Sequence, residues 1–498
     1  MRRVLLPLAL VLAALALVAS GCGDSSSGNA LDDSLGYVPK NSLAVIAIKT
    51  DPDDAQFKNI GKLIDKFPFA NQFKEQFKQG IQANGTQVKY EDDIKPLLGN
   101  DLVVAIPPAP GGLAGGTDSS DTPFLLAWET AGGDIEKLAS EGDSRKVGEV
   151  EGFTVYQDPD GSAAAVKDDT VVAAKTRQLL DAALKGHGAD DRMSEDDFDA
   201  GLGDLSKDAL VRVTGNFQTI LANDPSAAEA LKVPWVKGLR TFGSTIASAE
   251  DGISSDFEVK TEGVTAEQQP LATGPAPAAV VRRPGEVGVG LRGPAQVVSF
   301  IESVAKVTDP ESLLNKDKVG KQLGVDIDKD VVGALGENST VSFSLDGNVA
   351  ARADLKDPAA FKKTLDTIMK NLNKARRSQG KPESKVEKDS NGLYTVSEPG
   401  DDEPTVIGVV GEVLVIANEA DRAQEIAGQS ASPVPGTKGA LVMTADPKSI
   451  VSEVLKKQGN SGAALIIGPA LSSHLESLNG SVESAADGLR GTFKLTIK

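Results

Sequence analysis

Few residues of this 498-residue chain have the type and spacing that metal binding requires. Four carboxylates follow positions 1, 3, 5 and 12 of a calcium-binding loop: Asp326, Asp328, Asp330 and Glu337. Position 6 of such a loop needs a glycine for its sharp turn, and Val331 stands there instead. We therefore expect a charged turn before a strand, and we keep the four carboxylates only as weak candidates for a metal site.

The histidines and the cysteine do not follow a catalytic pattern. The chain has two histidines, His187 and His474, and one cysteine, Cys22. Zinc sites and thiol catalysis need several such residues in one place. The glycines of "GVGLRG" at residues 288–293 follow a dinucleotide-binding string, but they alternate with apolar residues as in a strand. We expect a non-enzymatic protein that uses no cofactor.

The single cysteine suits lipid attachment. Two arginines precede an apolar run over residues 4–19, which is shorter than the roughly 20 residues of a membrane-spanning helix. Small residues then precede Cys22, and this stretch resembles the lipobox of bacterial lipoproteins, in which the cysteine is alkylated with diacylglycerol and becomes the new N-terminus. The alternative is an incidental cysteine beside a secretory cleavage site.

The charge of the chain limits its partners. The chain has 52 Lys and Arg residues against 71 Asp and Glu residues, a formal net charge of −19. A body of this charge is repelled by nucleic acid and by anionic lipid surfaces. We therefore expect no nucleic-acid partner, and we expect membrane contact to come through the N-terminal lipid, outside the cytoplasm.

Two halves of the chain repeat each other. "SAEDGISSDFEVK" at residues 248–260 matches "SAADGLRGTFKLT" at residues 484–496, and segments upstream match in the same order. Asp-Gly between alternating apolar residues favours hairpins, which make neighbouring strands antiparallel. We predict an α+β fold of two homologous domains, each a mainly antiparallel sheet with helices packed on one face. The predicted parts are a signal peptide over residues 1–21, a lipidated, flexible tether over residues 22–36, a first domain over residues 37–263, a Pro/Gly/Ala linker over residues 264–280 and a second domain over residues 281–498.

The opening of the first copy resembles a known family. "LGYVPKNSLAVIAIKTDPDDAQFKNIGKLIDKFP", followed by "YEDDIKPLLGNDLVVAI", is similar to the bacterial envelope family named domain of unknown function 3352. The matching residues are Pro39, Asp51, Phe67, Pro68, Asp93, Pro96 and Gly99. Leu97 stands where many relatives have Trp. The family is uncharacterised, so the resemblance implies no activity and no catalytic residue.

A stripe of phenylalanines is the remaining candidate site. Phe69, Phe73 and Phe77 recur every four residues, which aligns them on one face of a helix. Such a stripe either packs on the sheet as core or forms one wall of an apolar groove. Our first hypothesis is a membrane-anchored extracytoplasmic lipoprotein with a binding or scaffolding role in the bacterial cell envelope, which would contact another envelope protein. The alternative is a carrier of a lipid or other apolar ligand between this helix and the sheet.

Overall fold

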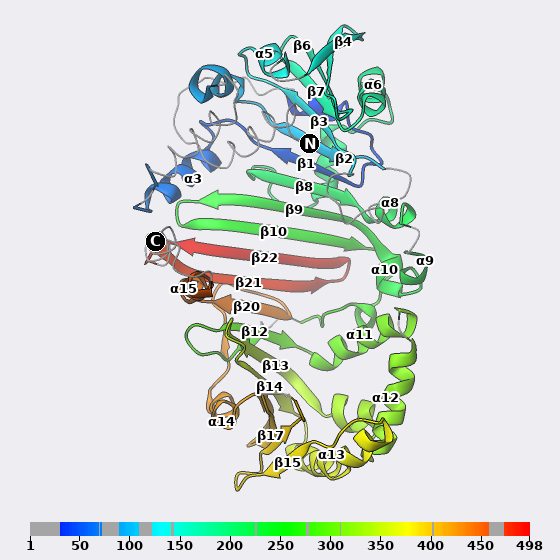
Figure 1. The fold of residues 1–498 in the computed structure, drawn as a ribbon, viewed down its shortest axis with the longest axis vertical. Helices are drawn as coiled ribbons and strands as arrows, with labels where there is room; N and C mark the ends of the chain where they lie inside the picture. Colours follow the sequence, from blue (N-terminus) through cyan, green and yellow to red (C-terminus); the bar gives the residue numbers. More distant parts are fainter. Residues whose placement is uncertain are drawn as a thin grey trace. The chain divides into compact units, whose positions relative to one another are not determined.

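The fold is α+β with a large antiparallel sheet, as predicted (Figure 1). The computed structural model describes residues 30–68, 70–71, 89–108, 122–140, 144–224, 227–274, 278–308, 310–400, 403–457 and 473–498. Cys22, Phe69, Phe73 and Phe77 lie outside the described residues. Among the helices of the described part, none is both long and apolar enough to cross a membrane.

The chain divides into two compact units. The first unit contains the described residues within Met1–Ala227, Leu239–Lys260 and Ile497–Lys498. The second unit contains those within Ala228–Gly238 and Thr261–Thr496. The described part of the expected linker belongs to the second unit, where the side-chain amide of Gln269 donates to the backbone oxygen of Ala485 at 2.7 Å.

Hydrogen bonds join the strands of the first unit into one sheet, with antiparallel partners throughout the recorded registers. In spatial order the strands are β10 (Gly252–Thr261), β9 (Leu239–Ala249), β8 (Val211–Asn216), β1 (Ala44–Ile48), β2 (Leu102–Ile106), β3 (Leu125–Glu129), β7 (Thr170–Ala174), β6 (Ala163–Lys167), β5 (Phe153–Gln157) and β4 (Arg145–Val150). The central strands β2 ("LVVAI") and β3 ("LLAWE") are apolar at nearly every position, so both of their faces need cover.

Helices cover both faces of the first unit's sheet, so the expectation of helices on one face only is wrong for this unit. On one face, Leu126 and Trp128 are buried among residues of α3, η1, η2 and α5. On the other face, Leu125 and Ala127 are buried among residues of α2, α6 and α7. The helices of this unit, with α9 at its boundary, are α2 (Ala30–Leu35), α3 (Ala55–Asp65), η1 (Tyr90–Ile94), η2 (Lys95–Leu97), α5 (Ile135–Ser140), α6 (Arg177–Lys185), α7 (Glu195–Leu202), α8 (Phe217–Ala222) and α9 (Ala227–Ala230).

Part of the predicted tether is structured. Residues 30–35 form α2, which lies against β2 and β3. Leu35 is fully buried, and Tyr37 and Val38 join the same apolar cluster. These apolar side chains distinguish residues 30–36 from the Ser- and Gly-rich residues before them, because they give this segment surface to bury.

The second unit has the same strand order as the first. Its strands, again with antiparallel partners in the recorded registers, are β22 (Gly488–Ile497), β21 (Leu475–Ala485), β20 (Leu441–Ala445), β12 (Val287–Arg292), β13 (Leu335–Phe343), β14 (Val349–Leu355), β18 (Val413–Ala417), β17 (Thr405–Val410), β16 (Tyr394–Ser397) and β15 (Lys385–Lys388). A separate pair joins β11 (Ala279–Val280) to β19 (Ser432–Pro433).

The second unit has the three longest of the described helices, α11, α12 and α13. Its helices are α10 (Pro234–Gly238), η4 (Ala266–Gln268), α11 (Pro294–Thr308), α12 (Pro310–Leu323), η5 (Ile327–Val332), α13 (Pro358–Ser378), α14 (Ala420–Gly428) and α15 (Pro447–Lys457). The long helix α13 begins with Pro358 after Asp357, whose carboxylate accepts from the Ala360 N–H at 2.9 Å and caps the helix.

Candidate ligand-binding site

A row of apolar side chains crosses the sheet of the second unit. Five of them are successive pairing partners on the neighbouring strands β12, β13, β14, β18 and β17: Val289, Val341, Ala351, Ile416 and Ile407. We call these five residues the apolar row. Because neighbouring strands lie about 4.8 Å apart, the apolar row is about 19 Å long. Phe343 and Val349 pair with each other beside it, two residues along their strands and therefore on the same face.

The centre of this face is open to solvent. Val341 and Ile416 are each 38% exposed, Phe343 is 36% exposed and Val349 is 46% exposed. Single exposed apolar residues are normal on a protein surface, but four that adjoin on paired strands form a patch. Contiguous exposed apolar patches mark sites of ligand or partner binding.

The helices beside the apolar row cover only part of it. Helix α13 covers one end, where Phe361 and Leu365 are buried in a cluster with Ile407 and Tyr394. Helix α11 lies along β13, but Pro294 is the only buried residue of this fully described helix, and Ile301 is 58% exposed. Other apolar side chains of α11, such as Val297, Val298 and Phe300, are half-buried. The apolar row is therefore covered at the α13 end and open along α11.

The opposite face of β13 explains why its apolar side is left outside. Thr340 and Ser342, which alternate with Val341 and Phe343, are almost fully buried. The Thr340 hydroxyl accepts from the backbone N–H of Val281 at 3.0 Å, and the Ser342 hydroxyl donates to Glu286. Polar groups are stable inside a protein only when they are hydrogen-bonded, and these two are.

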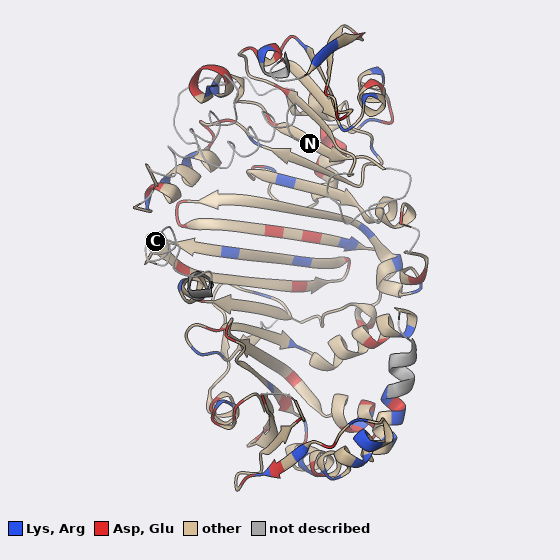
Figure 2. Cartoon of the chain, viewed as in Figure 1, with Lys and Arg blue, Asp and Glu red and all other residues tan. Residues whose placement is uncertain are grey.

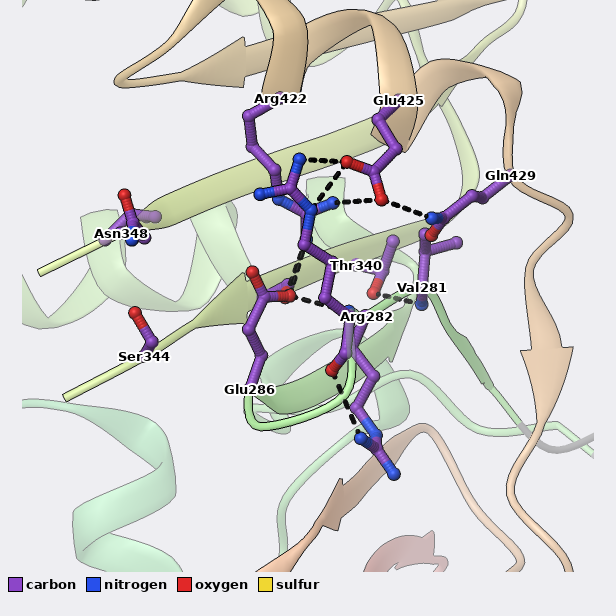
Figure 3. A network of polar contacts seen from close by, with 12 residues as sticks. Val281, Arg282, Glu286, Thr340, Ser344, Asn348, Arg422, Glu425 and Gln429 are labelled. Atoms are coloured by element: carbon purple, nitrogen blue, oxygen red, sulfur yellow. Dashed lines mark hydrogen bonds and ion pairs between the residues drawn. The ribbon is translucent and has the colours of Figure 1, made fainter. Parts of the chain in front are cut away.

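A buried ion pair completes this polar cluster (Figure 3). Arg422 of α14 is 1% exposed, and its Nη2 donates to Glu286 Oε2 at 2.6 Å and to the Ser342 hydroxyl at 3.0 Å. Its Nη1 lies 3.7 Å from Glu425 Oε1, within ion-pair distance but too far for a hydrogen bond. We call Glu286, Ser342 and Arg422 the buried polar cluster.

Two further side chains hold Glu425 at the edge of the buried polar cluster. Arg283 Nε donates to Glu425 Oε2 at 2.5 Å, and Gln429 Nε2 donates to Glu425 Oε1 at 2.8 Å. Arg283 thereby holds the pKa of Glu425 below its ordinary value. Burial lowers the pKa of Arg422, but an arginine starts so high that it stays charged. A charged guanidinium cannot exchange protons near neutral pH, so Arg422 is not suited to act as a general acid or base.

The carboxylates with calcium-loop spacing are not brought together. Asp326 caps η5, and the Asp330 carboxylate accepts from the Asp326 N–H at 2.9 Å. Asp328 pairs with Lys316, while Glu337 lies on β13. Across the described ranges, no three His, Cys, Asp or Glu side chains are grouped so as to hold a metal ion.

Of the other residues singled out from the sequence, none within the described ranges belongs to the apolar row. Cys22 and the Phe69, Phe73 and Phe77 stripe lie outside the described residues. His187 stacks on Tyr37 with ring centroids 4.0 Å apart, in the first unit. Sequence analysis missed the apolar row itself. The alternation in "TVSFSL" at residues 340–345 signals a strand with one apolar side, but it predicts that this side faces the core.

Comparison with known proteins places the chain in a family without placing it near a characterised protein. No curated protein matches it. Structures titled "Structure of crystal form III of TP0453" and "Structure of crystal form I of TP0453" are 13% and 11% identical, with a TM-score of 0.27 for both. Each alignment covers 47% of this chain, and 81% and 80% of those chains respectively; TM-scores this low do not establish a shared fold. The model of the family described as protein of unknown function (DUF3352) matches residues 4–381, most of the chain, and the protein therefore belongs to this family.

Proposed function

We propose that this protein binds an apolar ligand, such as the acyl chain of a lipid, on the apolar row of the second unit. The observation that carries the proposal is the exposure of Val341, Phe343, Val349 and Ile416 on paired strands. Covering such a surface is favourable by about 25 cal/mol per Å² of apolar area removed from water. The apolar row, at about 19 Å, is long enough for an extended long-chain acyl group.

The proposal keeps the carrier hypothesis but moves the binding surface. The sequence pointed to the Phe69, Phe73 and Phe77 stripe, whereas the described surface that is open and apolar lies in the second unit. We propose no enzymatic role, because the polar side chains behind the apolar row already have partners. Thr340 accepts from the Val281 backbone N–H, and Ser342 pairs with Glu286 and Arg422.

Binding can be tested with the neutral fluorescent probe N-phenyl-1-naphthylamine. Phe343→Asp should weaken its affinity at least about tenfold, because it places a charge on the apolar face. Val147→Asp is the matched control, since Val147 is 45% exposed on β4 of the first unit and away from the apolar row. If both variants lost affinity for the probe to the same extent, or if neither lost affinity, the proposal would be contradicted. Native mass spectrometry after mild extraction should show a bound lipid that Phe343→Asp lacks.

We also propose that the protein is an extracytoplasmic lipoprotein of the bacterial cell envelope, anchored through lipidated Cys22. The support is the apolar leader and the small residues before Cys22. Cys22→Ser should shift the protein from the membrane fraction to the soluble extracytoplasmic fraction. A variant that stays in the membrane fraction to the same extent would refute lipid anchoring.

We further propose that the two units arose by duplication and are homologous domains. Their strand orders agree strand for strand, and α6 and α14 both begin three residues after the end of the preceding strand, β7 or β18. Tyr156 and Tyr394 also occupy equivalent pairing positions next to Ala164 and Ile407. Residues 30–263 and 264–498, expressed separately, should each unfold cooperatively, because these fragments keep α2 with the first unit and the linker with the second. Halves that fold only when mixed would argue against independent domains.

A further inference from the structure

The helices α12 and α13 are basic although the protein is acidic. Together they have nine Lys and Arg residues against three Asp and Glu residues, a net charge of +6 within a chain of net charge −19. Figure 2 shows Lys and Arg, in blue, gathered along these two helices. At 0.1 M salt an exposed charge acts over about 10 Å, so a nearby partner responds to this local excess more than to the distant acidic residues.

Three lysines of α13 form a stripe. Lys363, Lys370 and Lys374 are exposed and are spaced by seven and four residues, which places them on one side of the helix. The stripe is about 16 Å long at 1.5 Å per residue. The opposite side of α13 is apolar, since Phe361 and Leu365 are buried against the sheet.

Two lysines of α12 extend the basic surface. Lys318 and Lys321, with Lys374 from α13, line a hollow of about 590 Å³. Its other lining residues are Asp317, Gln322 and Ser378, so three cations, an amide and a hydroxyl face one carboxylate. We call Lys318, Lys321, Lys363, Lys370 and Lys374 the basic surface.

The basic surface differs from the other cations of these helices in its lack of partners. Lys316 pairs with Glu302, Arg376 with Glu398, and Arg377 with Glu383. Within the part of the chain that the structure describes, no carboxylate lies within ion-pair distance of any lysine of the basic surface. Unpaired exposed lysines keep their full attraction for an external anion.

We propose that the basic surface docks on anionic phospholipid headgroups. A stripe of 16 Å, as estimated from the helical rise, exceeds one small anion and suits an extended surface of several phosphates. Helix α13 also packs on Ile407 and Tyr394 at the end of the apolar row, so the side of the second unit that meets the headgroups adjoins its open apolar face. This interaction concerns a different surface from the apolar row, and it stands even if apolar-ligand binding fails.

The test is binding to vesicles by residues 22–498 with Cys22→Ser, which keeps every described residue but lacks the leader and the lipidation site. This protein should co-sediment with phosphatidylglycerol vesicles and not with phosphatidylcholine vesicles. Added salt should weaken its binding to the phosphatidylglycerol vesicles. Replacing Lys363, Lys370 and Lys374 by Gln should lower the affinity for these vesicles on the order of 100-fold. Each basic residue near an anionic surface raises the binding constant about fivefold.

A matched control separates this surface from general charge loss. Replacing Lys146, Lys185 and Lys232 by Gln removes the same charge from other exposed positions and should change the affinity less than about twofold. Circular dichroism of both variants checks that they fold. Equal binding by the two variants, equal binding to both lipids, or complete displacement by inorganic phosphate at constant ionic strength would overturn the proposal.

Discussion

The apolar row of the second unit has a counterpart in the first unit, in which three of the five residues are buried and two are half-buried. The counterpart residues are successive pairing partners on β1, β2, β3, β7 and β6: Ile46, Val104, Leu126, Ala173 and Ala164. Leu126, Ala173 and Ala164 are each only 2% exposed. The strands and their order are the same in both units, so the difference comes from the cover, which is tight where α3, η1, η2 and α5 pack and loose where α11 lies.

The opposite faces of the two sheets differ in chemistry. At the positions of Glu286, Ser342 and Arg422, the strand pairing and the helix register of the first unit place Leu43, Ala105 and Leu179. Leu43 and Ala105 are buried, and Leu179 packs against the same apolar core. The buried polar cluster thus replaces an apolar core at the same place in the fold. The comparison teaches that one strand order can bury both faces of its sheet, as in the first unit, or leave part of one face open, as in the second.

The largest expected effect comes from breaking the buried polar cluster on one side. Arg422→Leu copies the first unit's Leu179 but leaves Glu286 as a buried charge without its partner. We expect a loss of about 3–5 kcal/mol in the free energy of unfolding, measured by denaturant titration. A loss below about 1 kcal/mol would mean that water already reaches Glu286.

Replacing all three residues of the buried polar cluster by the residue types of the first unit should restore the free energy of unfolding that Arg422→Leu loses. The triple variant Arg422→Leu, Glu286→Leu and Ser342→Ala removes both charges together with the hydroxyl. Replacing a buried ion pair by well-packed apolar residues is often neutral, or stabilising by about 1–4 kcal/mol. The triple variant should therefore be at least as stable as the natural protein. Additive losses would show that apolar residues cannot replace the buried polar cluster in the second unit.

A smaller effect tests whether the apolar row is less buried than its counterpart in the first unit. Leu126→Ala removes a core side chain and should cost about 2–5 kcal/mol. Ile416→Ala removes a side chain that is 38% exposed, and it should cost about 1 kcal/mol or less. Thermal and denaturant unfolding of both variants measure the difference. Equal costs would show that α11 closes over the apolar row in solution.

The smallest expected effect is a pH dependence specific to the second unit. Because Arg283 lowers the pKa of Glu425 in the folded protein, this pair contributes stability above the ordinary glutamate pKa of 4.5 and loses it as the pH falls through the lowered value. The first unit has Ala182 at the position of Glu425 and has no such contribution there. Arg283→Met should cost about 0–1 kcal/mol at pH 7, and this cost should vanish in acid. A cost that is independent of pH would assign the effect to packing.

The predicted fold depended on patterns that are local in the sequence. Asp251-Gly252 and Asp487-Gly488 mark tight turns, and alternation around them indicates antiparallel strands. In the structure each glycine is the first residue of a long strand. The positive φ of Asp168, at 50°, also fits a tight turn between β6 and β7. Short-range backbone preferences of this kind depend on a few neighbouring residues, so the sequence alone determined the α+β class and the order of its elements.

The tertiary structure alone decided which side of each strand became core. In β13 the sequence alternates Thr340 and Ser342 with Val341 and Phe343, and the hydrophobic pattern by itself predicts that the apolar pair is buried. The structure buries the hydroxyl side instead, because Glu286 and Arg422, 56 and 80 residues away from Ser342, provide its partners. An alternating pattern specifies two faces but not what packs against each. That depends on distant residues, so the open apolar row could be found only in three dimensions.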